Sequence, residues 1–222
     1  MNKVFIVANL KSYKTENESK EWLENLKKIK DIGVSLENKE IIVCPPFQLL
    51  LMFKTYILEN NLPVSIGAQD VSPFDEGAYT GEVNAKQVKD FADYVLIGHS
   101  ERRKNFGETD DVLSKKTVLA LKYELTPIYL IQNKDTVVSQ GIQIIAYEPI
   151  FAIGSGNPDT PENANEIAGF LKSKNSDYKL LYGGSVSSQN VNSFTSLSNI
   201  SGVLVGSASL DALEFIKIIE NA

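Results

Sequence analysis

The sequence feature that most constrains the fold is a repeated alternation of short apolar runs with amphipathic segments. Eight runs, each of about four to seven residues, are apolar on consecutive positions, a pattern typical of parallel strands buried on both faces. The runs are Val4–Asn9, Glu40–Pro45, Pro63–Gln69, Tyr94–Gly98, Pro127–Ile131, Gln143–Tyr147, Lys179–Tyr182 and Gly202–Val205.

The segments between these runs have the spacing of amphipathic helices. Apolar side chains recur along three of them, at Trp22, Leu23, Leu26 and Ile29, at Leu50, Phe53 and Ile57, and at Leu210, Leu213, Ile216 and Ile219. Thr160 followed by Pro161 predicts a helix start, with threonine as the N-cap and proline in the first turn.

About eight strand–helix units predict an α/β fold, a (β/α)8 barrel that occupies residues 1–222 as a single domain. No linker or low-complexity stretch divides the chain. A doubly wound open sheet is the alternative, because the number of strands does not report whether the sheet closes. The dinucleotide-binding pattern that favours an open sheet is missing, since the segment Gly154-Ser155-Gly156-Asn157-Pro158-Asp159 lacks the third glycine.

Composition excludes several classes of protein. The net charge is −6, the isoelectric point is about 5.0, and no cluster of basic residues is present, which argues against a nucleic-acid-binding protein. No run approaches the roughly 18 apolar residues of a membrane span, so we expect no membrane partner. One cysteine, Cys44, and one histidine, His99, cannot supply a zinc site of thiolates and imidazoles. The lone cysteine fits a cytoplasmic location.

Polar residues gather where the predicted strands end, which is where barrels of this kind place their active sites. His99 follows an apolar strand and precedes a predicted helix, whose dipole disfavours a protonated ring. A neutral imidazole can donate a hydrogen bond to a substrate carbonyl. Glu148 ends another strand and is followed by the apolar loop Pro149–Ser155, which we interpret as a lid that removes water from a general base.

Glycines and serines follow the last strands, where barrels often bind phosphate through backbone N–H groups. Gly154, Ser185, Gly206 and Ser207 are the candidates for this role. Lys11, which follows the first strand, is the candidate positive charge opposite the phosphate.

Motifs at successive strand ends also resemble one known family. They are Asn9-Leu10-Lys11, Val43-Cys44-Pro45-Pro46-Phe47, Gly67-Ala68-Gln69-Asp70, Gly77-Ala78-Tyr79-Thr80-Gly81-Glu82-Val83, Gly98-His99-Ser100-Glu101-Arg102-Arg103, Phe106-Gly107-Glu108-Thr109-Asp110, Ala146-Tyr147-Glu148-Pro149 with Ala152-Ile153-Gly154-Ser155-Gly156, and Tyr182-Gly183-Gly184-Ser185. Over nearly its whole length the chain resembles the triosephosphate isomerases.

The resemblance implies interconversion of dihydroxyacetone phosphate and D-glyceraldehyde 3-phosphate, a step of glycolysis and gluconeogenesis, without a metal or organic cofactor. It implies that Glu148 moves the proton and that neutral His99 polarises the carbonyl, a division of roles for which this family is the standard example. It further implies that Asn9 and Lys11 stabilise the enediolate. Ser100 and Glu101 are expected to support these side chains.

The resemblance assigns further roles to the phosphate loop and the lid. Gly154, Ser185, Gly206 and Ser207 are expected to bind phosphate. The expected lid residues are Pro149, Ile150, Phe151, Ala152, Ile153, Gly154 and Ser155. The loop Asp75–Glu82 resembles the family's interface loop, so the expected partner is a second copy in a homodimer, with a tetramer as the alternative.

The sequence also departs from the family. Ser207 replaces a glycine, Leu130 and Asn133 replace a cysteine and a glutamate, and Pro158 lies in the trailing hinge of the lid. The connection from the fifth to the sixth strand is short, so we expect its helix to be reduced to about one turn near residues 134–139. A different phosphosugar enzyme, or a phospholigand-binding protein with little catalytic activity, are the alternatives that these departures leave open.

Overall fold

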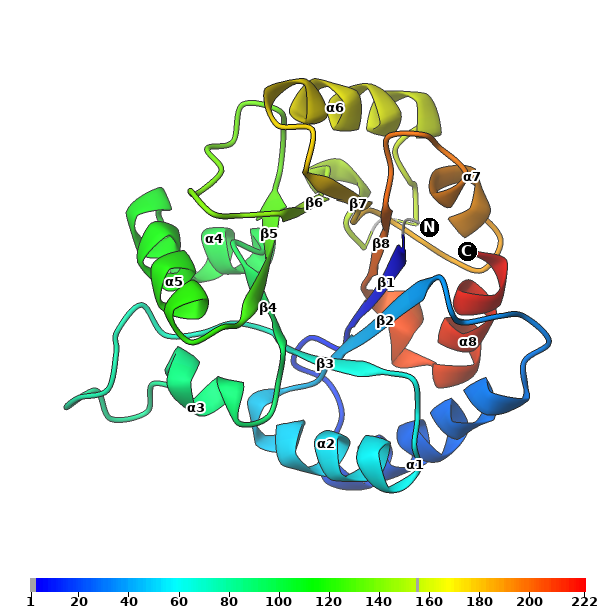
Figure 1. Cartoon of the computed structure of the whole chain (residues 1–222), viewed down its shortest axis with the longest axis horizontal. Coiled ribbons are helices and arrows are strands. Elements are labelled where there is room, and N and C mark those ends of the chain that lie inside the picture. Colours follow the sequence, from blue (N-terminus) through cyan, green and yellow to red (C-terminus); the bar gives the residue numbers. More distant parts are fainter. Residues whose placement is uncertain (1–2, 155) are drawn as a thin grey trace.

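Eight parallel strands close into a barrel around which the helices are arranged (Figure 1). The computed structural model describes residues 3–154 and 156–222. The strands are β1 (Val4–Asn9), β2 (Lys39–Cys44), β3 (Ser65–Ala68), β4 (Tyr94–Ile97), β5 (Thr126–Ile131), β6 (Ile144–Tyr147), β7 (Lys179–Tyr182) and β8 (Gly202–Val205). All eight lie within two residues of the runs that the sequence predicts.

The barrel closes between its first and last strands. β1 pairs in parallel with β8, from Phe5 opposite Gly202 to Ala8 opposite Val205. Gly202 has a φ of 152°, and a Cβ atom there would lie 2.0 Å from the carbonyl oxygen of Phe5, so only glycine fits at this point of the seam. The predicted (β/α)8 barrel is confirmed, and the open-sheet alternative is wrong.

Most of the helices described begin after a residue whose side chain caps the first turn, whereas those that begin at Leu50 and Val191 have no such cap. The helices are α1 (Glu16–Leu26), α2 (Leu50–Glu59), α3 (Ala85–Lys89), α4 (Ser100–Phe106), α5 (Asp110–Lys122), α6 (Pro161–Lys174), α7 (Val191–Thr195) and α8 (Ala212–Asn221), with short 3₁₀ helices η1 (Lys27–Asp31), η2 (Phe47–Leu49), η3 (Ile150–Ala152) and η4 (Ser207–Leu210). Thr160 caps α6 by accepting a hydrogen bond from the N–H of Asn163, which confirms the predicted start.

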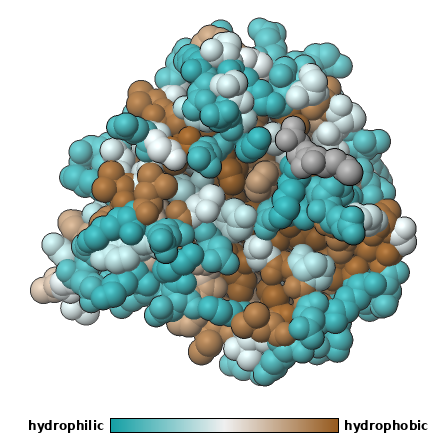
Figure 2. Space-filling model, viewed as in Figure 1, coloured by the Kyte–Doolittle hydropathy of each residue, from teal (hydrophilic) through white to brown (hydrophobic). Residues whose placement is uncertain are grey.

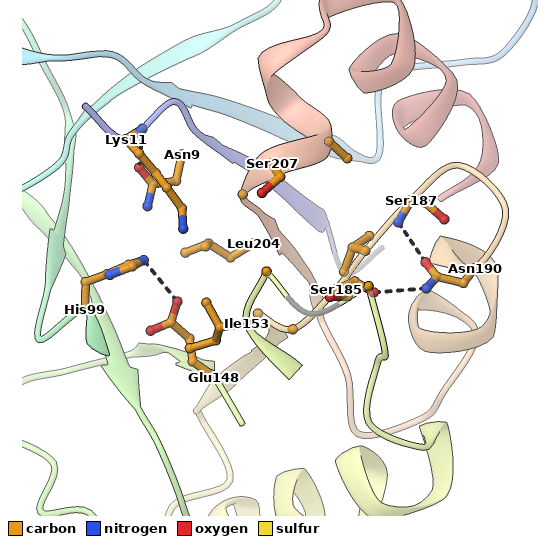
Figure 3. A pocket seen from close by; sticks show the side chains of 17 residues that line it. Asn9, Lys11, His99, Glu148, Ile153, Ser185, Ser187, Asn190, Leu204 and Ser207 are labelled. Atoms are coloured by element: carbon orange, nitrogen blue, oxygen red, sulfur yellow. Dashed lines mark hydrogen bonds and ion pairs between the residues drawn. The ribbon is translucent and has the colours of Figure 1, made fainter. Parts of the chain in front are cut away.

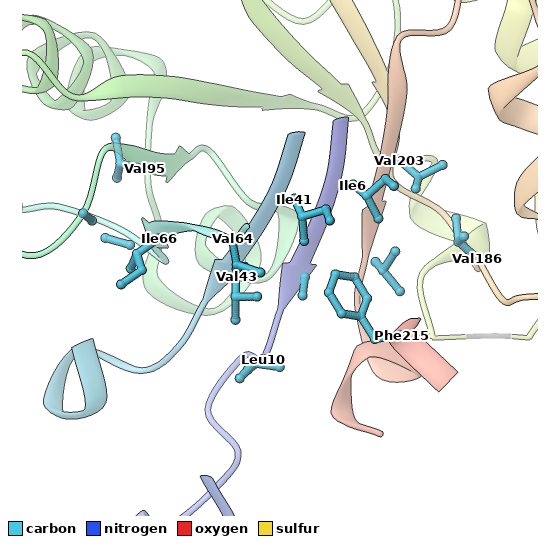
Figure 4. Packing of buried hydrophobic residues seen from close by; sticks show 14 of the residues in the cluster. Ile6, Leu10, Ile41, Val43, Val64, Ile66, Val95, Val186, Val203 and Phe215 are labelled. Atoms are coloured by element: carbon cyan, nitrogen blue, oxygen red, sulfur yellow. The ribbon is translucent and has the colours of Figure 1, made fainter. Parts of the chain in front are cut away.

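Alternation along the strands divides the apolar side chains between two cores. Ile6, Ala8, Ile41 and Val43 point outward and pack under the helices, where Phe215 of α8 joins them (Figure 4). The intervening residues fill the barrel interior with a second cluster: Val7, Ile42, Cys44, Leu96, Ile128, Leu130, Ile144, Ala146, Leu181 and Leu204. Both faces of every strand are therefore buried, which explains the continuous apolar runs in the sequence.

The predicted apolar face of α8 is only partly right. Ile216 and Ile219 are buried as expected, but Leu213 is 41% exposed, and Phe215 and Ile218 are buried instead. Steps of three residues advance a helix by about 300° rather than a full turn, so a set spaced by threes drifts around the helix. Leu210 lies before the helix, in η4.

The connection between β5 and β6 contains turns and no helix among residues 132–143, all of which the structure describes. The predicted shortening is thus confirmed, and here it removes the helix altogether. With no helix in this connection, apolar side chains stay exposed at Val118 and Leu121 of α5 and at Val137 of the connection itself. Figure 2 shows hydrophobic surface over this part of the molecule.

Candidate active site

A pocket of about 340 Å³ lies at the carboxyl ends of the strands (Figure 3). Its lining includes all the residues that the sequence proposes as catalytic or phosphate-binding: Asn9, Lys11, His99, Glu148, Gly154, Ser185, Gly206 and Ser207. These residues come from five different strand ends and from the lid. The barrel therefore brings together groups that lie up to about two hundred residues apart in the chain.

His99 lies at the start of α4 with its ring directed into the pocket (Figure 3). It is the N-cap of α4, and its ring Nδ1 accepts a hydrogen bond of 3.1 Å from the backbone N–H of Glu101. An Nδ1 that accepts cannot carry a proton, so the ring proton lies on Nε2. Nε2 faces the pocket and lies 3.2 Å from Oε1 of Glu148. The neutral imidazole stays a prediction, and an Nδ1 that accepts a hydrogen bond is consistent with it.

Glu148 is a buried carboxylate with two donors. It is 2% exposed, and its Oε2 accepts a hydrogen bond of 3.2 Å from the backbone N–H of Ser100. Burial raises the pKa of Glu148, and the neighbouring His99 ring, hydrogen bonding from Ser100 and the Lys11 ammonium offset this only in part. The result is a stronger base than an exposed glutamate. Ser100 contacts the Glu148 carboxylate through its main-chain N–H.

Lys11 is fixed in a strained backbone conformation. Its φ is 52°, which is rare for a residue with a side chain. Three contacts hold it: its N–H donates to Oδ1 of Asn9 at 3.0 Å, its carbonyl accepts from Nε2 of Gln69 at 2.8 Å, and its ammonium pairs with Oε1 of Glu101 at 2.5 Å. The supporting role expected for Glu101 matches this last contact.

The segments that follow β7 and β8 form the end of the pocket at which the sequence predicts phosphate binding. Ser185 donates its hydroxyl to the carbonyl of Ala152 at 2.6 Å, which joins this loop to the lid. Ser207 opens the short helix η4 and is exposed. A Cβ atom at Gly206 would lie 3.3 Å from Cε of Lys11, so the lysine stem runs close to this glycine.

Several pocket residues were not predicted from the sequence. Asn190 accepts a hydrogen bond from the Ser187 N–H at 2.8 Å and donates to the Ser185 carbonyl at 3.0 Å, so it shapes the loop after β7. No sequence pattern marks it. Leu204 forms the floor of the pocket, and alternation along β8 could have placed it inside the barrel.

The lid segment carries exposed apolar side chains. Ile150 and Phe151, in η3, are 67% and 65% exposed, whereas Ala152 is fully buried. Ile153 and Gly154 line the pocket, and Ser155 lies outside the described residues. A segment with this much exposed hydrocarbon can gain stability by folding over the pocket.

The sites of the family departures differ in their surroundings. Leu130 is fully buried inside the barrel. Asn133 is exposed, and its side chain accepts a hydrogen bond of 2.9 Å from the N–H of Asp135, which tightens the turn after β5. Within residues 3–154 and 156–222, no group of three or more His, Cys, Asp or Glu side chains could hold a metal ion. None of the helices described is long and apolar enough to cross a membrane.

Comparisons with known proteins agree with this geometry. A family model described as triosephosphate isomerase matches residues 4–222. The chain is 38% identical to the triosephosphate isomerase of Trichodesmium erythraeum, over 99% of each chain, and 37% identical to that of Dictyoglomus turgidum, over 100% of each. It is 36% identical to a triosephosphate isomerase of Mesomycoplasma hyopneumoniae, over 99% of this chain and 100% of the relative. The chain therefore belongs to the triosephosphate isomerase family of enzymes.

Proposed function

We propose that this protein interconverts dihydroxyacetone phosphate and D-glyceraldehyde 3-phosphate, and that it does so through an enediolate. The observation that carries the proposal is the arrangement of His99, Glu148 and Lys11 around one pocket. A basic carboxylate and a neutral imidazole donor, held 3.2 Å apart, are suited to moving a proton beside a carbonyl.

Glu148 is the proposed base. It takes the proton from the carbon next to the carbonyl and returns it to the neighbouring carbon. The Nε2 proton of His99 can serve only one acceptor at a time, so a substrate carbonyl that binds it displaces Oε1 of Glu148. Substrate binding thereby releases the carboxylate from the imidazole and turns it toward the carbon acid.

Lys11 and Asn9 stabilise the negative charge of the enediolate in this mechanism. Their positions are fixed before the substrate arrives, by the Asn9–Lys11 hydrogen bond and the Glu101 ion pair. Preorganised donors of this kind act mainly on the transition state. Gly154, Ser185, Gly206 and Ser207 bind the substrate phosphate through backbone N–H groups, and the lid from Pro149 to Ser155 closes over it to exclude water.

We further propose that residues 1–222 form a single barrel domain and that the protein acts in the cytoplasm. It associates as a homodimer through Asp75–Glu82, with a tetramer as the alternative. The loop is largely exposed, and its Tyr79 ring stacks at 4.3 Å on that of Phe74, the residue before the loop, with 45% of each residue exposed, which supports a docking role.

A coupled assay with glyceraldehyde 3-phosphate tests this function. We expect turnover by the unaltered protein, and a loss of kcat of about 10²- to 10⁴-fold in Glu148→Asp and in His99→Gln, the range for removing a general acid or base. The shorter carboxylate of Asp cannot reach the substrate carbon, and glutamine lacks the imidazole's ability to exchange protons. Glu162→Asp, at an exposed position of α6, is the matched control and should keep full activity. Normal turnover by Glu148→Ala would refute the mechanism.

A further inference from the structure

The trailing end of the lid holds a buried carboxylate that the proposed reaction does not use. Asp159 follows Asn157 and Pro158, directly before the N-cap of α6, and is 7% exposed. Burying a carboxylate costs free energy unless donors surround it. The groups that hydrogen-bond to Asp159 therefore indicate the role of this buried carboxylate.

The Asp159 side chain accepts three hydrogen bonds. Oδ2 accepts from Nδ2 of Asn163 at 2.6 Å and from the hydroxyl of Tyr147 at 3.2 Å. Oδ1 accepts from the N–H of Thr160 at 2.8 Å, and the Asp159 N–H itself donates to the Tyr182 hydroxyl at 2.7 Å. Burial, followed by the charge of Asp159, raises the pKa of Tyr147, so this phenol keeps the proton that it donates.

Each of the two tyrosines directly precedes part of the pocket. Tyr147 is the last residue of β6 and adjoins Glu148, and Tyr182 is the last residue of β7 and adjoins Gly183. The Tyr182 ring stacks on Phe194 at 3.9 Å, which fixes its direction. A Cβ atom at Gly184 would lie 2.1 Å from the Tyr182 hydroxyl, so the phosphate loop runs directly over the group that Asp159 contacts.

We propose that Asp159 is a positioning residue that anchors the trailing end of the lid to the ends of β6 and β7. Through Tyr147 the Asp159 carboxylate couples closure of the lid to the placement of Glu148, and the Asp159 main-chain N–H holds the same segment against the Tyr182 hydroxyl beside the phosphate loop. The inference rests on the isomerase function proposed above. It concerns the Asp159 carboxylate, which touches neither the substrate nor the reacting atoms.

A side reaction reports whether the lid closes correctly. An enediolate with phosphate on the adjacent carbon can eliminate it: the carbon–oxygen bond breaks, the electron pair leaves with inorganic phosphate, and the remaining enol takes up a proton on its terminal carbon and loses its hydroxyl proton to form a 2-oxoaldehyde. A closed site that holds the phosphate suppresses this loss. Phosphate released per isomerisation is thus a readout that a merely structural residue would not change.

The test compares Asp159→Ala and Tyr147→Phe with the unaltered protein. For each we measure kcat, KM, the ratio of phosphate released to substrate isomerised, and the melting temperature, with all assays well below that temperature. Asp177→Ala is the matched control, because Asp177 is exposed and precedes β7 at the other end of the barrel.

For Asp159→Ala we expect kcat to fall about tenfold and the phosphate ratio to rise about tenfold, a modest case of active-site misplacement. Tyr147→Phe should shift both in the same directions by a smaller factor, and Asp177→Ala should shift neither. A folded Asp159→Ala with an unchanged phosphate ratio overturns the inference, even if kcat falls. If that variant does not fold, an unchanged ratio in Tyr147→Phe overturns it. Absence of isomerisation by the unaltered protein refutes instead the function on which the inference rests.

Discussion

At the scale of single residues, the chemistry of the site depends on groups held in unfavourable states. Glu148 is a carboxylate from which water is almost excluded, and Lys11 occupies a backbone region that side chains rarely adopt. Neither arrangement stabilises the fold. Both place charge where the proposed reaction needs it, so we expect these residues to cost stability.

Because the pKa of Glu148 is raised, the stability that its burial costs depends on pH. A carboxyl whose folded pKa lies above its ordinary value of 4.5 binds more protons in the native state, so stability falls as pH rises from 4.5 through the raised value. We expect Glu148→Gln, which cannot ionise, to gain free energy of unfolding relative to the unaltered protein across this window, by about 1.4 kcal/mol for each unit by which the pKa is raised.

Denaturant unfolding at a series of pH values from 4 to 8 measures this difference. The size of the difference at a single pH does not test the prediction, because the Gln amide also changes the hydrogen bonds to Ser100 and His99. The test is how the difference changes: we expect it to grow as pH rises above 4.5, and a difference that is independent of pH or shrinks with rising pH contradicts the prediction.

At the scale of elements, the end of β5 links the two proposed catalytic residues. The carbonyl of Ile131 accepts a hydrogen bond of 2.8 Å from the Glu148 N–H, and the Gln132 side chain donates to the carbonyl of Gly98, just before His99, at 3.3 Å. The turn after β5, closed by the Asn133 side chain, keeps Gln132 beside β4. The short connection thus also helps to hold the backbone at Glu148 and before His99.

Removing this link should affect both stability and turnover. We expect Gln132→Ala to lose about 1 kcal/mol of unfolding free energy, the usual worth of one hydrogen bond. We also expect kcat to fall severalfold, because the peptide before His99 is held less firmly. Asp135→Ala, an exposed substitution in the same turn, is the control for both measurements. Lower stability with unchanged kcat would show that Gln132 only joins the strands.

At the scale of the whole molecule, the proposed dimer depends on a loop that extends beyond the ring of helices (Figure 1). Asp75 fixes the base of this loop, since it pairs with Lys122 at 2.5 Å and accepts from the Tyr123 hydroxyl at 2.7 Å, contacts that lower the pKa of Asp75 to about 2. The loop therefore presents the stacked Phe74 and Tyr79 rings in a fixed position, which reduces the entropy lost on association.

Sedimentation at micromolar concentration checks this assembly. We expect a dimer for the unaltered protein, and for Tyr79→Ala a dissociation constant raised by about 30-fold or more, the cost of truncating a central aromatic residue. Leu58→Ala removes an exposed apolar side chain from α2, away from the loop, and should leave the dimer intact. A monomeric unaltered protein contradicts the assembly, and a tetramer points to a second interface beyond this loop.

The number, order and approximate ends of the strands can be predicted from the sequence alone. Each follows from a local pattern, since a strand buried on both faces must be apolar at successive positions. The same logic identified the pocket residues, because polar and glycine residues directly after buried strands have few structural reasons to be there. It failed for α8, where the spacing by threes did not identify the buried side, and for Asn190, which no pattern marks.

Only the tertiary structure decided what depends on residues far apart in the chain. Closure is set by the seam between β1 and β8, and a strand pattern is the same in an open sheet and a closed one. The 3.2 Å contact between His99 and Glu148 and the hydrogen bond between Tyr147 and Asp159 are likewise products of the closed barrel. Side-chain packing and hydrogen bonds between separate strand ends create these features, and no local stretch of sequence contains both partners.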